Sequence, residues 1–159
     1  MKKPISGFPA IPPEASVPHI PVDFLGDVRA FNKKFGLEEP EKPACPSVEL
    51  HQFRYKFMRE ELLEWDDSVV AHRIGFTEEA KTAELANQLD ALVDLVYVVL
   101  GTVLLQGMGD VFEEAWSRVQ TANMAKVRVA NASESKRGSA LDMVKPPGWK
   151  APDHTDLVR

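Results

Sequence analysis

The segment from Leu89 to Leu105, LDALVDLVYVVLGTVLL, is almost wholly apolar, yet it carries Asp90 and Asp94. Leucine and valine occupy the rest of the helical circumference around these acids, which predicts a buried core helix. Rotating the helix so that either aspartate faces water would also expose apolar neighbours. We therefore expect at least one of the two aspartates to be partly buried. An unpaired buried carboxylate is costly and normally takes up a proton or a cation. The segment therefore predicts a polar site within a helical core.

The rest of the chain also has helical periodicity. We expect four helices, at residues 22–35, 48–73, 78–106 and 111–129. Ser47 and Thr77 are the expected N-caps of the second and third helices. Asp110 with Glu113 forms a capping-box-like start to the fourth. No segment predicts a convincing strand, so the expected fold class is all-α, with a four-helix-bundle-like arrangement.

Proline-rich segments flank these helices. Prolines are dense in residues 1–21, which are expected to form an extended arm. Residues 22–130 are expected to form the helical domain, and residues 131–159 a polar loop followed by an extended tail. A length of 159 residues suits one domain.

Charge and composition exclude several classes of function. A formal net charge of -5 argues against a protein that binds a nucleic acid polymer through a basic face. The start of the chain has no continuous apolar stretch typical of a signal peptide. The apolar run Leu95–Leu105 is shorter than the roughly 18 to 20 residues of a membrane span. A single cysteine, Cys45, fits a reducing compartment, so the cytoplasm is the expected location and no membrane partner is expected.

Acidic residues also interrupt the apolar stripe of the second helix. The stripe formed by Leu50, Phe53 and Phe57 continues at helical spacing to Glu61 and Glu64. Carboxylates on two consecutive helices repel each other, and a divalent cation with oxygen ligands, Mg²⁺ or Mn²⁺, removes that repulsion. No histidine lies three residues after a glutamate, so a ferritin-like di-iron site is excluded, and zinc is disfavoured.

Two ordinary explanations for these acids remain open. Arg54, Lys56 and Arg59 are close in sequence and can neutralise them, and a run of charges is often only a solvated helix face.

The apolar surface of the third helix exceeds what one chain can cover, which favours a homodimer, with a tetramer as the fallback. The larger aromatic residues at helical spacing are expected in the core, namely Phe53, Phe57, Trp65 and Trp116.

Four motifs resemble those of one superfamily. They are EELLE at residues 60–64, DALVDLVYVVLGT at 90–102, ANMAK at 122–126 and KPPGWKAPD at 145–153. From about Phe24 to Pro152 the chain resembles the all-α nucleoside triphosphate pyrophosphohydrolases, which include MazG, phosphoribosyl-ATP pyrophosphatase and the dimeric dUTPases, and it is closest to small MazG-like proteins. The second motif departs from the family's Glu-x-x-Asp pattern, because Asp90 and Asp94 stand four residues apart.

The resemblance implies an Mg²⁺-dependent enzyme that cleaves a nucleotide between its α- and β-phosphates. The implied metal ligands are Glu60, Glu61, Glu64, Asp90 and Asp94, with Glu60 also a candidate to deprotonate the attacking water. The late Asn-x-x-Lys element implies that Asn123 and Lys126 reach the substrate phosphates. Arg54 and Lys145 are further candidates for these contacts, and Phe31, on the short first helix, is expected to stack on a base. Asn123 and Lys126 are expected on one helix face. The expected substrate is a pyrimidine deoxynucleotide such as dUTP or a non-standard triphosphate; the alternatives are phosphoribosyl-ATP and a non-catalytic helical interaction module.

Overall fold

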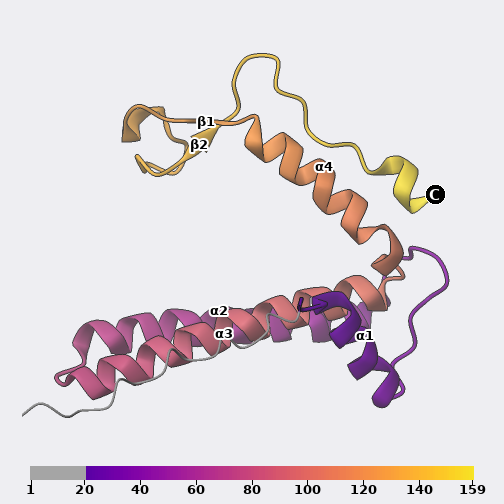
Figure 1. The fold of residues 1–159 in the computed structure, drawn as a ribbon, viewed down its shortest axis with the longest axis horizontal. Helices are drawn as coiled ribbons and strands as arrows, with labels where there is room; N and C mark the ends of the chain where they lie inside the picture. Colours follow the sequence, from indigo (N-terminus) through magenta and orange to yellow (C-terminus); the bar gives the residue numbers. More distant parts are fainter. Residues whose placement is uncertain (1–20) are drawn as a thin grey trace, which may run out of the picture.

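The computed structural model describes residues 21–159, so the predicted arm at residues 1–21 lies almost wholly outside the described residues. Its α-helices are α1 (Phe24–Lys34), α2 (Val48–Ile74), α3 (Glu78–Leu105) and α4 (Phe112–Met124). Two short strands, β1 (Val127–Arg128) and β2 (Met143–Val144), pair antiparallel. Single 3₁₀ turns lie at η1 (Gly109–Val111), η2 (Ala132–Glu134) and η3 (Thr155–Val158). The predicted all-α fold class is confirmed (Figure 1).

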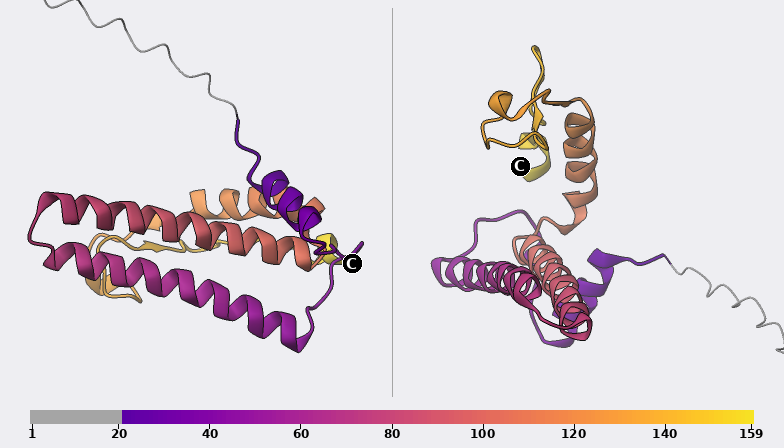
Figure 2. Two further views of the ribbon diagram at one scale, coloured as in Figure 1. Left: turned by 90° about the horizontal axis from the view of Figure 1, so that it is seen from below. Right: turned by 90° about the vertical axis from the view of Figure 1, so that its left-hand side faces the viewer.

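The long helices α2 and α3 form an antiparallel hairpin and lie side by side along their length (Figures 1 and 2). The predicted caps are confirmed, because Ser47 Oγ accepts from the backbone N–H of Leu50 at 3.1 Å and Thr77 Oγ1 accepts from that of Ala80 at 3.1 Å. Gly75 follows the end of α2, where the chain turns back. These local signals set the start and the end of α2 and the start of α3.

A small core lies where α1 crosses the C-terminal part of α3. Val28, Leu100 and Leu104 are buried there, and Phe112 at the start of α4 packs against them. Asp23 caps α1 through a 2.8 Å bond from the backbone N–H of Gly26. The core therefore joins three helices at one end of the hairpin.

The turn between α3 and α4 is closely packed. Gly107 has a φ of +67°, and a Cβ at this position would collide with the carbonyl oxygen of Lys42. Arg29 of α1 donates to two carboxylates, that of Glu39 in the segment after α1 at 3.1 Å and that of Asp110 in η1 at 2.9 Å. Repulsion between those two acids is thus relieved by a shared guanidinium, and we call residues 106–111 the joint.

Two predictions about the fourth helix are wrong. Asp110 does not cap it, because Asp110 lies in the 3₁₀ turn and its carboxylate bonds Arg29 instead. The helix ends at Met124, not near Val129, because Val127 and Arg128 leave it to pair with Val144 and Met143. The helical periodicity of the sequence continues through these strand residues, so it predicts too long a helix.

Helix α4, β1, β2 and the C-terminal segment form a unit, residues 112–159, that we call the C-terminal limb. It projects away from α1, α2 and α3, and its main contact with the rest of the chain is at the joint (Figures 1 and 2). The segment predicted as an extended tail runs back along α4 and ends in η3. The chain thus has two parts, a helical hairpin with α1 and a limb beside it.

Much of the apolar surface expected in the core is exposed in the single chain. Phe53, Phe57 and Trp116 are exposed, and only Trp65 of the four predicted core aromatics is half-buried. On α3 an exposed apolar stripe follows spacings of four and three residues: Leu85, Leu89, Leu92, Val96 and Val99. The burial predicted for Phe53, Phe57 and Trp116 is wrong in the single chain. The exposed stripe agrees with the expectation that one chain cannot cover the third helix, because α1 and α2 cover only parts of the circumference of α3. We call this stripe the α3 seam.

By length and composition α3 is also apolar enough to cross a membrane, with a mean hydropathy of 1.8 over its best window. Core helices of soluble proteins pass the same test. In this chain α3 carries Asp90 and Asp94 in its middle and packs along a charged partner helix, α2. A single helix that passes this test is weak evidence for a membrane span.

Candidate active site

The acids predicted from the two motifs lie on facing helices. Glu60, Glu61 and Glu64 are on α2, and Asp90 and Asp94 are on α3. Glu61 is half-buried, and its pKa is raised above its ordinary value, first by burial and then by the negative charges of the other four carboxylates. The structure therefore brings all five residues into one electrostatic neighbourhood centred on Glu61, which we call the acid cluster.

The burial predicted for the aspartates is wrong in the single chain. Asp90 and Asp94 are both exposed, and Glu61 is the member of the cluster that is partly withdrawn from water. The physical reason is the same one that leaves the α3 seam uncovered, since the two-helix hairpin encloses only one side of each helix. The repulsion that the sequence predicts is present at Glu61, where carboxylates of both helices contribute to it.

Basic side chains do not neutralise the acid cluster within residues 21–159. None of its five carboxylates takes part in an ion pair there. Arg54 instead donates from Nε to Thr102 Oγ1 at 3.0 Å and from Nη2 to the carbonyl oxygen of Val98 at 2.6 Å. Burial lowers the pKa of Arg54. Arg54, which the sequence offers as a partner for the acids, therefore links α2 to α3, and the acids form no ion pair within residues 21–159.

A hollow of about 340 Å³ opens beside the acid cluster. Its lining includes Glu64 and Asp90 from the cluster, together with Ser68, Glu84 and Asn87. Asn87 Nδ2 donates to Glu84 Oε2 at 3.1 Å. Sequence reasoning did not select Glu84 or Asn87, although Asn87 stands three residues before Asp90 and so shares its helix face. The hollow adds an amide and a further carboxylate to the oxygen-rich surface.

The donor chemistry of this surface fits a hard divalent cation. Carboxylate and amide oxygens are the ligands that Mg²⁺ and Mn²⁺ prefer, and the neighbourhood contains no histidine or cysteine member. Within residues 21–159 no three such side chains are gathered closely enough to hold an ion. The backbone thus places the donors on facing helices, and side-chain rotation is needed to bring them together.

The predicted phosphate contacts lie on the C-terminal limb. Lys126 Nζ is 6.0 Å and Lys145 Nζ is 4.3 Å from the centroid of the Trp149 ring, so both ammonium groups gather over one aromatic side chain. Asn123 is exposed on the last turn of α4. The prediction that Asn123 and Lys126 share a helix face is wrong, because α4 ends at Met124. Lys126 lies in the turn that follows, where its backbone N–H donates to the carbonyl oxygen of Asn123 at 3.0 Å.

Phe31 lies on α1 and is 42% exposed. Its ring packs edge-on against Tyr97 at 5.6 Å and beside Phe35 at 4.6 Å. Tyr97 follows Asp94 by three residues, so the aromatic group lies on a neighbouring part of the same helix surface as the acids. The exposed face of Phe31 leaves room for the predicted stacking on a base.

An all-α fold whose two longest helices carry neighbouring carboxylates agrees with the class of nucleotide pyrophosphohydrolases of the MazG-like superfamily. The family model for phosphoribosyl-ATP pyrophosphohydrolase matches residues 28–123, more than half of the chain, and the protein belongs to this family. The match spans α1 to α4 and includes every member of the acid cluster. No curated protein matches the chain.

Proposed function

We propose that this pyrophosphohydrolase cleaves a nucleoside triphosphate between its α- and β-phosphates, giving a monophosphate and pyrophosphate. The observation that supports this best is the half-buried Glu61, which has four other carboxylates in its neighbourhood and no ion pair with a basic side chain among residues 21–159. An acidic surface of this kind attracts a polyanionic substrate only when divalent cations lie between them.

Each predicted residue has a distinct task in this proposal. Glu61, Glu64, Asp90 and Asp94 would hold Mg²⁺, with Mn²⁺ as a substitute, and Glu60 would contribute to binding or accept the proton of the attacking water. The metal supplies charge neutralisation and acidifies water. Lys126, Lys145 and Asn123 would bind phosphate oxygens, Phe31 would stack on the base, and Arg54 would orient α2 and reach the substrate with its remaining nitrogen.

The substrate has two candidates. A pyrimidine deoxynucleotide such as dUTP, or a non-standard triphosphate removed from the nucleotide pool, agrees with the likeness to small MazG-like proteins. Phosphoribosyl-ATP is favoured by the family match itself. Release of pyrophosphate should be measured across the common and modified dNTPs and phosphoribosyl-ATP, with Mg²⁺ or Mn²⁺, at a cytoplasmic pH. Activity on none of them would overturn the proposal.

The substitution Glu61→Gln should distinguish between two explanations of the acid cluster, a metal site and a solvated helix face. Burial and the neighbouring negative charges raise the pKa of Glu61 above its ordinary value in the folded chain, so its ionisation costs stability as the pH rises above that ordinary value. Without divalent cations, Glu61→Gln should therefore melt at a higher temperature than the wild type at pH 7. The wild type should gain about 2.7 kcal/mol of stability when Mn²⁺ is 100-fold above its Kd, and the variant much less.

Thermal melting at several Mn²⁺ concentrations measures this difference. Asp66→Asn is the matched control, because it removes a carboxylate from the same exposed run of α2 but outside the cluster. Equal Mn²⁺ gains in all three proteins, or none in the wild type, would favour the non-catalytic helical module.

The α3 seam supports the proposed homodimer. Leu89 is 65% exposed and Leu92 is 44% exposed, and the alternating spacing of four and three is that of a helix pair that packs knobs into holes. Sedimentation should show a dimer, or a tetramer, at micromolar concentration, and a double Leu89→Glu and Leu92→Glu variant should shift it toward monomer. A wild type that sediments as a compact monomer would contradict the proposal.

A further inference from the structure

An apolar cleft lies between α1 and the C-terminal half of α3, and its volume is about 380 Å³. Val28 and Leu100, which are buried members of the small core, line its inner part. At its rim Phe24 is 64% exposed and Val93 is 55% exposed. The other lining residues are Asp27, Leu92, Val96 and Tyr97. We call this space the α1–α3 cleft, and it leaves one edge of the core open to water.

The lining of the α1–α3 cleft favours an apolar occupant. Asp27 is the only charged residue among the described residues that line it, and the Tyr97 hydroxyl is the only other polar side-chain group there. A lone carboxylate repels phosphate groups, so the cleft does not suit a nucleotide. An apolar cavity of about 150 Å³ already holds a group the size of benzene. The cleft therefore has room for two apolar side chains of a peptide segment.

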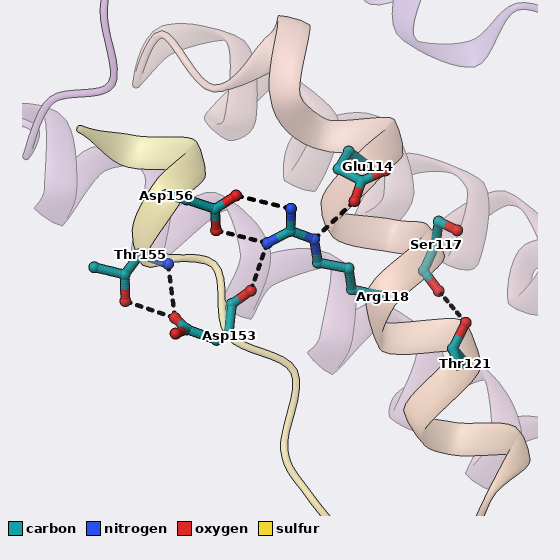
Figure 3. Close-up of polar contacts among 7 residues, drawn as sticks. All are labelled: Glu114, Ser117, Arg118, Thr121, Asp153, Thr155 and Asp156. Carbon is teal, nitrogen blue, oxygen red and sulfur yellow. Dashed lines mark hydrogen bonds and ion pairs between the residues drawn. The ribbon is translucent and has the colours of Figure 1, made fainter.

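The C-terminal segment does not fill the cleft, because it is held on α4. Arg118 donates to both carboxylate oxygens of Asp156 at 2.7 and 2.9 Å, and to Glu114 at 2.8 Å (Figure 3). The indole N–H of Trp149 donates to the carbonyl oxygen of Ala122 at 2.7 Å. These bonds fix the segment within the C-terminal limb, which projects away from α1 and α3 (Figure 1). The occupant must come from the other end of the chain or from another molecule.

The end of the predicted arm has the composition that suits the cleft. Residues 16–20, SVPHI, stand directly before the described part of the chain, and they carry the apolar side chains of Val17 and Ile20. Pro18 has no backbone N–H, so its burial leaves no donor without a partner. Segments that contain proline bind grooves lined by aromatic side chains, because their backbone is already restricted. Two of the side chains that line the cleft are aromatic.

The arm is tethered at the edge of the cleft. Asp23 accepts a 2.8 Å bond from the backbone N–H of Gly26, which fixes where the chain enters α1. Phe24, the first residue of α1, lines the cleft. A short tether gives an effective concentration of about 1 mM, roughly a thousandfold above that of a second copy present at micromolar concentration. The arm of the same chain is therefore favoured over a second copy as the occupant.

Residues 16–20 are long enough to cover the cleft. In an extended chain with about 3.1 Å per residue, Ile20 is within roughly 12 Å of Phe24 and Val17 within roughly 22 Å. The α3 side of the cleft, from Leu92 to Leu100, spans about 12 Å. Both apolar side chains of the segment can therefore enter the cleft without any change in α1.

We propose that residues 16–20 fold back into the α1–α3 cleft of their own chain, with the side chains of Val17 and Ile20 against Val28 and Leu100. The docked segment covers the open edge of the small core and holds α1 against α3. The inference is independent of the proposed function, because no part of it requires a metal or a nucleotide.

The melting temperature at one fixed protein concentration tests this docking. The double variant Val17→Ser and Ile20→Ser removes both apolar side chains from the segment. Its melting temperature should lie roughly 2 to 8 °C below that of the wild type, because the edge of the core is again exposed to water.

The double variant Ile5→Ser and Ile11→Ser is the matched control, since it removes two apolar side chains of the same arm that stand further from α1. Its melting temperature should equal that of the wild type. An unchanged melting temperature in the Val17 and Ile20 variant, or the same fall in both variants, would overturn the docking of residues 16–20.

Cross-linking identifies the chain to which the segment binds. In a Cys45→Ser background, His19→Cys and Val93→Cys place thiols on the segment and at the rim of the cleft, and Val17 and Ile20 stay intact. A short bifunctional thiol reagent should give a cross-linked monomer on a denaturing gel, with positions 19 and 93 joined in the peptides found by mass spectrometry. A cross-linked dimer would mean that the segment binds a second copy, and it would overturn the proposal.

Two controls distinguish docking from the effect of the tether alone. Adding Val17→Ser and Ile20→Ser to the same pair of cysteines should lower the rate of cross-linking roughly tenfold, because the segment then has no apolar side chain to bury. Val70→Cys in place of Val93→Cys puts the thiol at a valine of α2 that is 50% exposed and does not line the cleft, and it should not cross-link. Equal rates in all three proteins would contradict the docking.

Discussion

Glu64→Gln is expected to lower the rate of pyrophosphate release roughly 100- to 1,000-fold, the usual cost of removing one charge-stabilising group from a reaction centre. Glu64 belongs to the acid cluster and also lines the hollow between α2 and α3, so under the proposed function it would contact both the metal and the substrate. Because it is exposed on a long helix, its replacement should leave the helix content unchanged. Asp94→Asn should have an effect of the same size, from the opposite helix.

Steady-state rates with saturating Mg²⁺ measure this loss, and circular dichroism checks the fold. Asp66→Asn again serves as the comparison, since it exchanges the same chemical group on the same helix without touching the cluster. If Glu64→Gln keeps the wild-type rate while Asp66→Asn loses it, the metal would be held by the opposite face of α2, and the assignment of Glu64 as a ligand would be wrong.

Leu104→Ala should have the largest effect on stability, a loss of about 2–5 kcal/mol in the free energy of unfolding. Leu104 is fully buried in the small core, where it contacts the cluster of Val28 and Leu100 and lies against Gly109 of the joint. The cavity would open at the place where three helices and the joint meet, so little nearby structure can move to fill it.

Chemical denaturation at one fixed protein concentration should be used, because the stability of a dimer depends on concentration. Leu141→Ala, at a position that is 77% exposed, removes the same atoms and should change the free energy of unfolding by less than about 0.5 kcal/mol. Equal losses in the two variants would show that Leu104 does not hold the joint.

The sequence predicts the hairpin well because its signals are local. Ser47 and Thr77 carry the side-chain oxygens that cap α2 and α3, and Gly75 marks the break between them, so each boundary depends on a few neighbouring residues. The acids of the cluster could be chosen for the same reason, since helical spacing puts Glu61 and Glu64, and likewise Asp90 and Asp94, on one face each. That these residues hold a metal stays a prediction.

The failures concern contacts between residues distant in the sequence. Asp110 has the spacing of a cap, but a guanidinium 81 residues away competes successfully for its carboxylate. The end of α4 is set by pairing with Val144 and Met143, which no helical pattern reports. Burial of Asp90 and Asp94 was inferred from apolar neighbours on α3, yet exposure depends on how many helices surround it. Periodicity identifies a face but not what covers that face.

The small core of the single chain has a kinetic consequence. Six apolar side chains are buried in the described part of the single chain, and three of them form the small core. If two chains pair across the α3 seam as proposed, much of the free energy of folding comes from their encounter. Folding would then be a second-order process, and specific activity would fall on dilution and rise with expression level. Cells holding few copies would have little working enzyme, so abundance itself would regulate the reaction.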